Sequence, residues 1–84
     1  MNFRDFVSEQ KEDPEFTIIQ AMIDARKSAG LTQKELSERA GIAQGDISRM
    51  ENGNANPSIR TLQRLAEAMG MILKVEFLPR QNSL

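Results

Sequence analysis

The sequence predicts an all-α fold of short helices that ends in a single β-strand. Four of the five glycines follow a helical run, where a left-handed residue is needed to end a helix. After the last of these four, Gly70, the apolar spacing changes from a helical period to strict alternation. The length of 84 residues allows one domain with one small core.

The composition excludes several classes of protein. With 39% apolar and 27% charged residues and no long apolar run, the chain is typical of a globular domain rather than of a membrane or disordered protein. It has no Cys and no His, which removes disulfides, thiol nucleophiles, the usual zinc ligands and imidazole bases. We therefore expect no enzyme, no metal and no cofactor. Residues 1–5 open no secretory signal, so we expect a cytoplasmic protein.

The first two helices of the domain have clear start signals. Pro14 follows an Asp that can act as an N-cap, which predicts a helix over residues 14–29. Thr32 and Glu35 have the spacing of a capping box, in which each side chain bonds the backbone of the other residue. This spacing predicts a second helix over residues 33–40.

The next two helices start differently from one another. The third is expected over residues 44–52, after Ala43, which has no side-chain acceptor for a cap. Tertiary packing must therefore hold that start. Ser58 caps a fourth helix that runs to Met69.

An acidic head precedes a basic middle. The whole chain has a net charge of −1, but residues 1–15 carry −3 and residues 26–64 carry +3. Apolar residues at helical spacing predict an acidic N-terminal helical extension over residues 1–13. Its stripe either covers the chain's own domain or docks on a basic partner. The candidate partner-binding residues are Phe3, Asp5, Phe6, Val7, Glu9 and Glu12.

The alternation after Gly70 predicts a β-strand and a tail over residues 71–84, with Pro79 stopping the strand. The chain offers no second strand, so the backbone groups of this one would stay unpaired within a monomer. We therefore expect a two-stranded ribbon with a second copy. The candidate dimerisation residues are Ile72, Leu73, Val75 and Phe77.

The second and third helices are joined through Gly41 at the spacing of a helix-turn-helix, although a plain helical hairpin has the same spacing. The third helix is expected to turn its polar residues outward. Gln and Arg side chains can bond base edges bidentately in the major groove, so the residue types favour DNA binding. The outward residues are Gln44, Gly45, Asp46, Ser48 and Arg49.

Four segments, in order and at the expected spacing, resemble the Cro/repressor (XRE-type) helix-turn-helix family over residues 18–70. They are Gly30 to Leu36, Ala40 to Gln44, Ile47 to Gly53, and Pro57 and Ser58 with Leu62 to Ala66. The resemblance implies a five-helix repressor-type bundle, here over residues 14–70, that binds operator DNA as a dimer.

Both ends of the chain, from Phe3 to Phe16 and from Ile72 to Pro79, resemble the HigA-like antitoxin branch of this family. This narrower resemblance implies a repressor that also neutralises a basic toxin protein of ribonuclease type. Two alternatives stay open. One is a stand-alone XRE-type or phage regulator without a toxin, and the other is a protein-interaction module that does not bind DNA.

The resemblance also implies roles for single residues. Gln33 would bond a phosphate, and Gln44 would contact a phosphate or an adenine while bonding Gln33. Arg49 would read a base, and Asn52 and Asn54 would bond phosphates beyond the helix.

Other positions are either structural or open to two interpretations. Gly45 removes a possible base contact, and Asp46 either accepts from a cytosine amino group or only stabilises the first helical turn. The resemblance further implies an ion pair between Arg26 and Glu51, which would join the first helix to the end of the third. The expected core is Ile18, Met22, Leu31, Leu36, Ala40, Ile42, Ile47, Leu62, Leu65 and Ala66.

Overall fold

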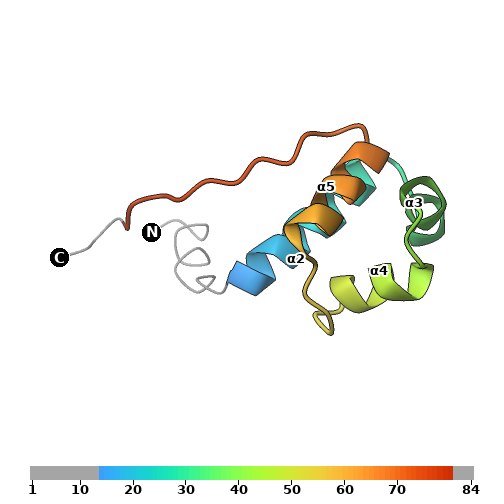
Figure 1. Cartoon of the computed structure of the whole chain (residues 1–84), viewed down its shortest axis with the longest axis horizontal. Helices are drawn as coiled ribbons and strands as arrows, with labels where there is room; N and C mark the ends of the chain where they lie inside the picture. Colours follow the sequence, from blue (N-terminus) through green and yellow to red (C-terminus); the bar gives the residue numbers. More distant parts are fainter. Residues whose placement is uncertain (1–13, 81–84) are drawn as a thin grey trace, which may run out of the picture.

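The computed structural model describes residues 14–80, with side chains from residue 17 onward. Four helices make up the described body: α2 (Pro14–Ser28), α3 (Gln33–Ala40), α4 (Gln44–Glu51) and α5 (Ile59–Ala68). Figure 1 shows α3 at one end of this body, where it contacts both α4 and α5, while α2 contacts α4. The all-α prediction and the predicted helix starts are confirmed.

The helix caps agree with the sequence patterns. The Thr32 hydroxyl accepts from the Glu35 N–H at 3.0 Å, and the Glu35 carboxylate accepts from the Thr32 N–H at 2.9 Å, so the capping box is complete. The Ser58 hydroxyl accepts from the Thr61 N–H at 3.0 Å. Ala43 provides no side-chain cap for α4, as expected.

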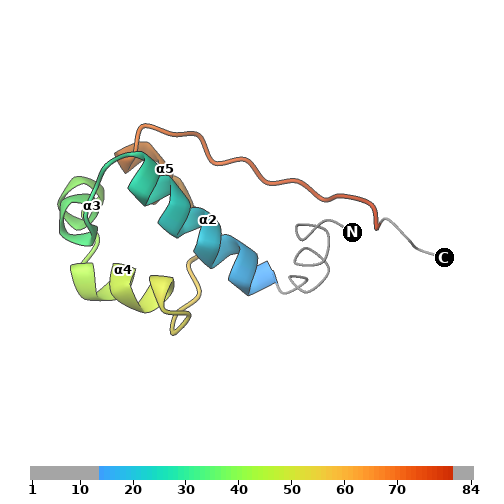
Figure 2. The same cartoon turned by 180° about the vertical axis from the view of Figure 1, so that it is seen from behind.

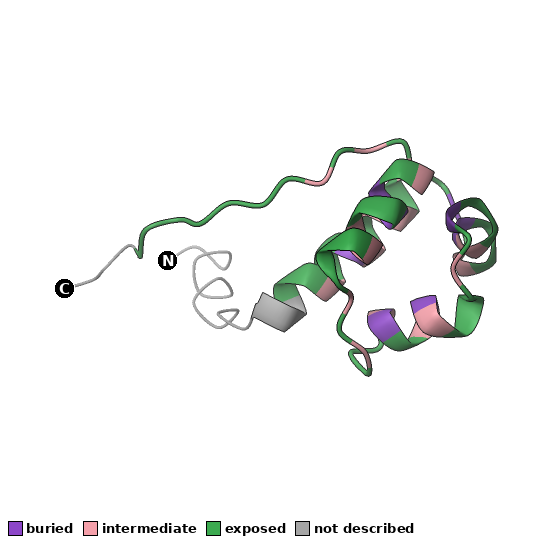
Figure 3. Cartoon of the chain, viewed as in Figure 1, coloured by how far each residue is buried: buried purple, intermediate pink, exposed green. Residues whose placement is uncertain are grey.

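Packing holds α4 in place. Ile47 is 0% exposed, and it lies in one core with Leu36 of α3 and Leu65 of α5. Figure 3 shows buried residues on α3, α4 and α5. A helix without its own cap is therefore stabilised by the apolar side chains that it buries against its neighbours.

The expected core is confirmed apart from its margins. Ile18 is 39% exposed, so its placement in the core was wrong. The reason is helix length: α2 has 15 residues and α4 has 8, so α4 cannot cover the first turns of α2. Ile42 and Leu62 are only partly buried against the core, whereas Met50, which the expected core lacked, is 4% exposed.

The predicted C-terminal β-strand is wrong. Residues 71–80 contain no strand, and they leave α5 as an extended arm, which we call the C-terminal arm (Figures 1 and 2). An alternating pattern makes the backbone extended, but a strand also needs the hydrogen bonds of a neighbouring backbone. The part of the chain that the structure describes has no second extended run at that place.

The implied count of five helices is also wrong, since residues 14–80 form four. After Gly70 the apolar residues alternate and Pro79 follows, so the arm has no apolar stripe at helical spacing to pack against the body.

The expected N-terminal extension over residues 1–13 lies outside the described residues. None of the helices within residues 14–80 is long and apolar enough to cross a membrane.

Candidate nucleic-acid interface

The turn between α3 and α4 is held from two sides. Gly41 ends α3 with a φ of +70°, and its N–H donates to the Ser37 carbonyl at 2.9 Å. The Ser37 hydroxyl donates to the Ile42 carbonyl at 2.5 Å. From α5, the Arg64 guanidinium donates to the carbonyls of Ala40 at 2.9 Å and Gly41 at 3.1 Å. These bonds fix the angle at which α4 leaves α3.

Sequence reasoning missed the role of Arg64. The residue is 24 positions from Ala40, and an Arg on an amphipathic helix gives no signal of a distant carbonyl partner. In the structure its positive charge lies at the C-terminal end of α3, where cations are favourable. A Cβ at Gly41 would lie 3.2 Å from the Arg64 guanidinium, which adds a steric reason for glycine there.

A buried polar network fixes the other end of α4. The Arg26 guanidinium donates to both carboxylate oxygens of Glu51, at 2.8 and 3.0 Å, and to the Leu31 carbonyl at 2.9 Å. The side chains of Arg26 and Glu51 are only 12% and 5% exposed. The predicted ion pair between α2 and α4 is therefore confirmed, in bidentate form.

Gln33 completes this network. Its amide donates to the Glu51 carboxylate at 2.9 Å, a partner that sequence reasoning missed, and the implied bond between Gln33 and Gln44 stays a prediction. A carboxylate is a stronger acceptor than a neutral amide, which explains why the Gln33 amide donates to Glu51. Burial raises the pKa of Glu51, but bonds from Arg26 and Gln33 and the nearby charges of Arg26 and Lys27 outweigh it, so the pKa lies below its usual value.

The outer side of α4 is polar, as predicted. Gln44, Gly45 and Arg49 are exposed, whereas Asp46 and Ser48 are half-buried. A Cβ at Gly45 would meet only the Arg49 guanidinium, at 4.0 Å, so packing does not require glycine there. The absence of a side chain leaves one side of that guanidinium open.

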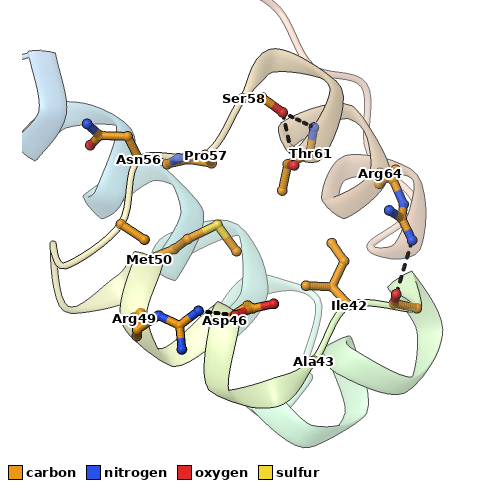
Figure 4. A pocket seen from close by; sticks show the side chains of 12 residues that line it. Ile42, Ala43, Asp46, Arg49, Met50, Asn56, Pro57, Ser58, Thr61 and Arg64 are labelled. Atoms are coloured by element: carbon orange, nitrogen blue, oxygen red, sulfur yellow. Dashed lines mark hydrogen bonds and ion pairs between the residues drawn. The ribbon is translucent and has the colours of Figure 1, made fainter.

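Asp46 and Arg49 form an ion pair one turn apart on α4. They lie on the wall of a groove of about 470 Å³ between α4, the following loop and the start of α5 (Figure 4). Met50 and Ile42 supply apolar surface to this groove, and Arg64 lies at its far side. The groove is open, so both members of the pair remain accessible to a ligand.

The remaining candidate residues are dispersed. Asn52 caps the C-terminal end of α4 and Asn54 follows in the loop, both exposed. Of the proposed dimerisation residues, Ile72 and Phe77 are 92% and 98% exposed on the C-terminal arm. Val75 is also exposed, and Leu73 is half-buried. The candidates in the acidic head lie outside the described residues.

The chain is similar to proteins named as helix-turn-helix transcriptional regulators. The sequence model of the helix-turn-helix family matches residues 22–72. An uncharacterised helix-turn-helix transcriptional regulator of Haemophilus influenzae is 33% identical over 66 residues, which cover 79% of this chain and 67% of that protein. The chain spans 60 to 67% of the lengths of three such relatives.

Two further similar proteins are named as parts of toxin–antitoxin systems. Antitoxin HigA1 of Mycobacterium tuberculosis is 34% identical over 58 residues, which cover 69% of this chain and 39% of that protein. Among solved structures, a toxin–antitoxin module from Streptococcus pneumoniae is 30% identical with a TM-score of 0.64, and the alignment covers 94% of each chain.

Proposed function

This chain belongs to the helix-turn-helix family, and from that premise we propose that it is a DNA-binding repressor that also serves as the antitoxin of a toxin–antitoxin pair. The observation that supports DNA binding best is that α4 is held firmly against the core while its polar side faces outward. Its inner side is buried at Ile47 and Met50, its end is tied down through Glu51, and its outer side carries exposed Gln44 and Arg49. A rigid helix with such side chains suits the major groove.

The contacts follow from this placement. Arg49 would donate to guanine, and Gln44 would contact an adenine or a phosphate. The N-terminal end of α3 would direct backbone N–H groups toward a phosphate, with Gln33 beside them. Asn52 and Asn54 would bond phosphates past the end of α4.

Replacing Arg49 with Ala is expected to weaken binding to the operator by about 1–3 kcal/mol and to weaken binding to unrelated duplexes by clearly less. The variant loses a base contact but only one charge. Titrations of the same protein on operator and on mixed-sequence duplexes measure both effects. Asn54→Ala is the control, because a lost phosphate contact lowers affinity for every duplex alike. Equal losses for Arg49→Ala on both duplexes would contradict base reading.

The antitoxin role draws on the relatives and on the ends of the chain. Similar proteins include a named antitoxin and a toxin–antitoxin module. The acidic head has a net charge of −3, which repels DNA phosphates and attracts a basic protein. We therefore assign the head to a basic toxin, of the ribonuclease type, and the basic middle of the chain to DNA.

Deleting residues 1–12 is expected to preserve operator binding and to abolish neutralisation of the toxin. Co-expression of the deleted chain with the protein encoded next to it measures protection, and co-purification measures the contact. Affinity is compared per folded molecule, so that a purely stabilising role of the head is separated from binding. If the cells stay protected and the pair still co-purifies, the head does not bind the toxin.

A stand-alone regulator remains the second candidate, because the relatives from Haemophilus influenzae and two other organisms are named only as transcriptional regulators. The neighbouring reading frame separates the two functions. A small, strongly basic protein encoded there supports the antitoxin, and a phage integrase or lysis cassette supports the stand-alone regulator.

A further inference from the structure

The exposed face of α4 carries no net charge. The helix has three charged residues, Asp46, Arg49 and Glu51. The Glu51 side chain is buried and is neutralised by Arg26, so it does not contribute to the exposed face. Asp46 and Arg49 neutralise one another, with side chains that are 48% and 58% exposed. A helix that enters the major groove passes between two rows of phosphates, so a carboxylate on that helix opposes binding unless a partner compensates it.

The geometry of the pair leaves Arg49 free to bind a base. Only one guanidinium nitrogen, Nη2, donates to Asp46, and only one carboxylate oxygen, Oδ1, accepts. A guanidinium has five N–H donors, and a carboxylate has about four acceptor positions. Each partner therefore keeps hydrogen-bonding capacity, on the groove side of α4 (Figure 4). Gly45 places no side chain against Arg49 on its other side.

We propose that Asp46 is a specificity-determining residue, which together with Arg49 reads a guanine and a neighbouring cytosine and which suppresses binding to other DNA. The inference rests on the proposed operator binding. Arg49 donates to the guanine, and the free lone pairs of Asp46 accept from the cytosine N4 amino group. Where no base amino group lies within reach, the carboxylate finds no base donor, and phosphate repulsion then weakens the complex.

A first-turn carboxylate also stabilises a helix N-terminus, and that role alone makes different predictions. A purely structural Asp46 would change the free energy of unfolding and leave sequence preference intact. Asp46→Asn keeps the shape of the side chain, but it removes the negative charge and replaces one acceptor oxygen with an NH2 group that donates. Glu67→Gln is the matched control, since it makes the same charge change at an exposed position on α5.

The test selects binding sites from a pool of randomised duplexes with the wild-type chain, Asp46→Asn and Glu67→Gln. The wild type is expected to select a guanine with an adjacent cytosine, and Asp46→Asn to lose the cytosine preference by about tenfold. On a mixed-sequence duplex, Asp46→Asn is expected to bind about three- to tenfold more tightly, with a salt slope steeper by about one. Glu67→Gln is expected to match the wild type.

The outcomes separate this inference from the proposed function. A wild-type chain that selects no sequence at all removes the operator binding on which the inference rests. A wild-type chain that selects a site which Asp46→Asn selects equally well, with equal binding to mixed-sequence DNA, overturns the role of Asp46 alone.

Discussion

Replacing Arg26 with Met is expected to destabilise the domain by about 3–5 kcal/mol, because among the described residues only Gln33 then remains as a side-chain donor to the buried Glu51 carboxylate. Small domains have a total stability of about 5–15 kcal/mol, so the variant is expected to lie close to unfolding. Urea denaturation followed by circular dichroism measures the loss. DNA binding then falls with the folded fraction, since α4 loses its attachment to α2.

The matched control is the double variant Arg26→Met with Glu51→Leu. Removing both charges leaves an apolar contact in place of the ion pair, and such replacements are often close to neutral. The double variant is therefore expected to be more stable than Arg26→Met alone. Additive losses in the double-mutant cycle would show that the two residues do not stabilise the fold as a pair.

The same network predicts the acid stability of the domain. The folded-state pKa of Glu51 lies below its unfolded value, which is about 4.3. The network therefore makes its full contribution to the free energy of unfolding at pH values above about 5. That contribution is lost as the pH falls through the folded-state pKa of Glu51. Glu51→Gln is expected to flatten the stability profile below about pH 5 while lowering stability at pH 7.

We propose that two copies of the chain pair through the C-terminal arm, and replacing Val75 and Phe77 together with Asp is expected to abolish that pairing and to lower operator affinity by about a hundredfold or more. Both side chains are exposed on the C-terminal arm, Val75 by 62% and Phe77 by 98%, together with Ile72 and Leu78. Such a concentration of exposed apolar surface marks an interaction site. We propose that a second copy covers it, so that two α4 helices engage two half-sites at once.

Analytical ultracentrifugation measures the oligomeric state, and operator titration measures affinity on one and on two half-sites. Lys74→Gln is the control, because it changes the same arm without removing apolar surface. The double Asp variant is expected to bind a single half-site as well as the wild type does. A variant that still sediments as a dimer would place the interface outside Val75 and Phe77.

The local structure of this protein followed from its sequence. The Thr32–Glu35 capping box, the Ser58 cap and the glycines that end helices act within a few residues, so their patterns are visible in one chain. The family resemblance extended this reading to one long-range contact, the ion pair of Arg26 and Glu51. The exposure of Gln44 and Arg49 followed from helical periodicity alone.

Only the tertiary structure decided how these pieces join. Arg64 bonds the α3–α4 turn and Gln33 bonds Glu51, and these partners are 24 and 18 residues apart. The acceptor that such a side chain bonds depends on which groups folding brings near it. The spacing of residues in the sequence does not show which groups these are. The C-terminal arm is a second case in which sequence pattern was not sufficient. Its alternation predicts an extended backbone, but a strand exists only where another backbone supplies the hydrogen bonds, and residues 14–80 of one chain supply none there.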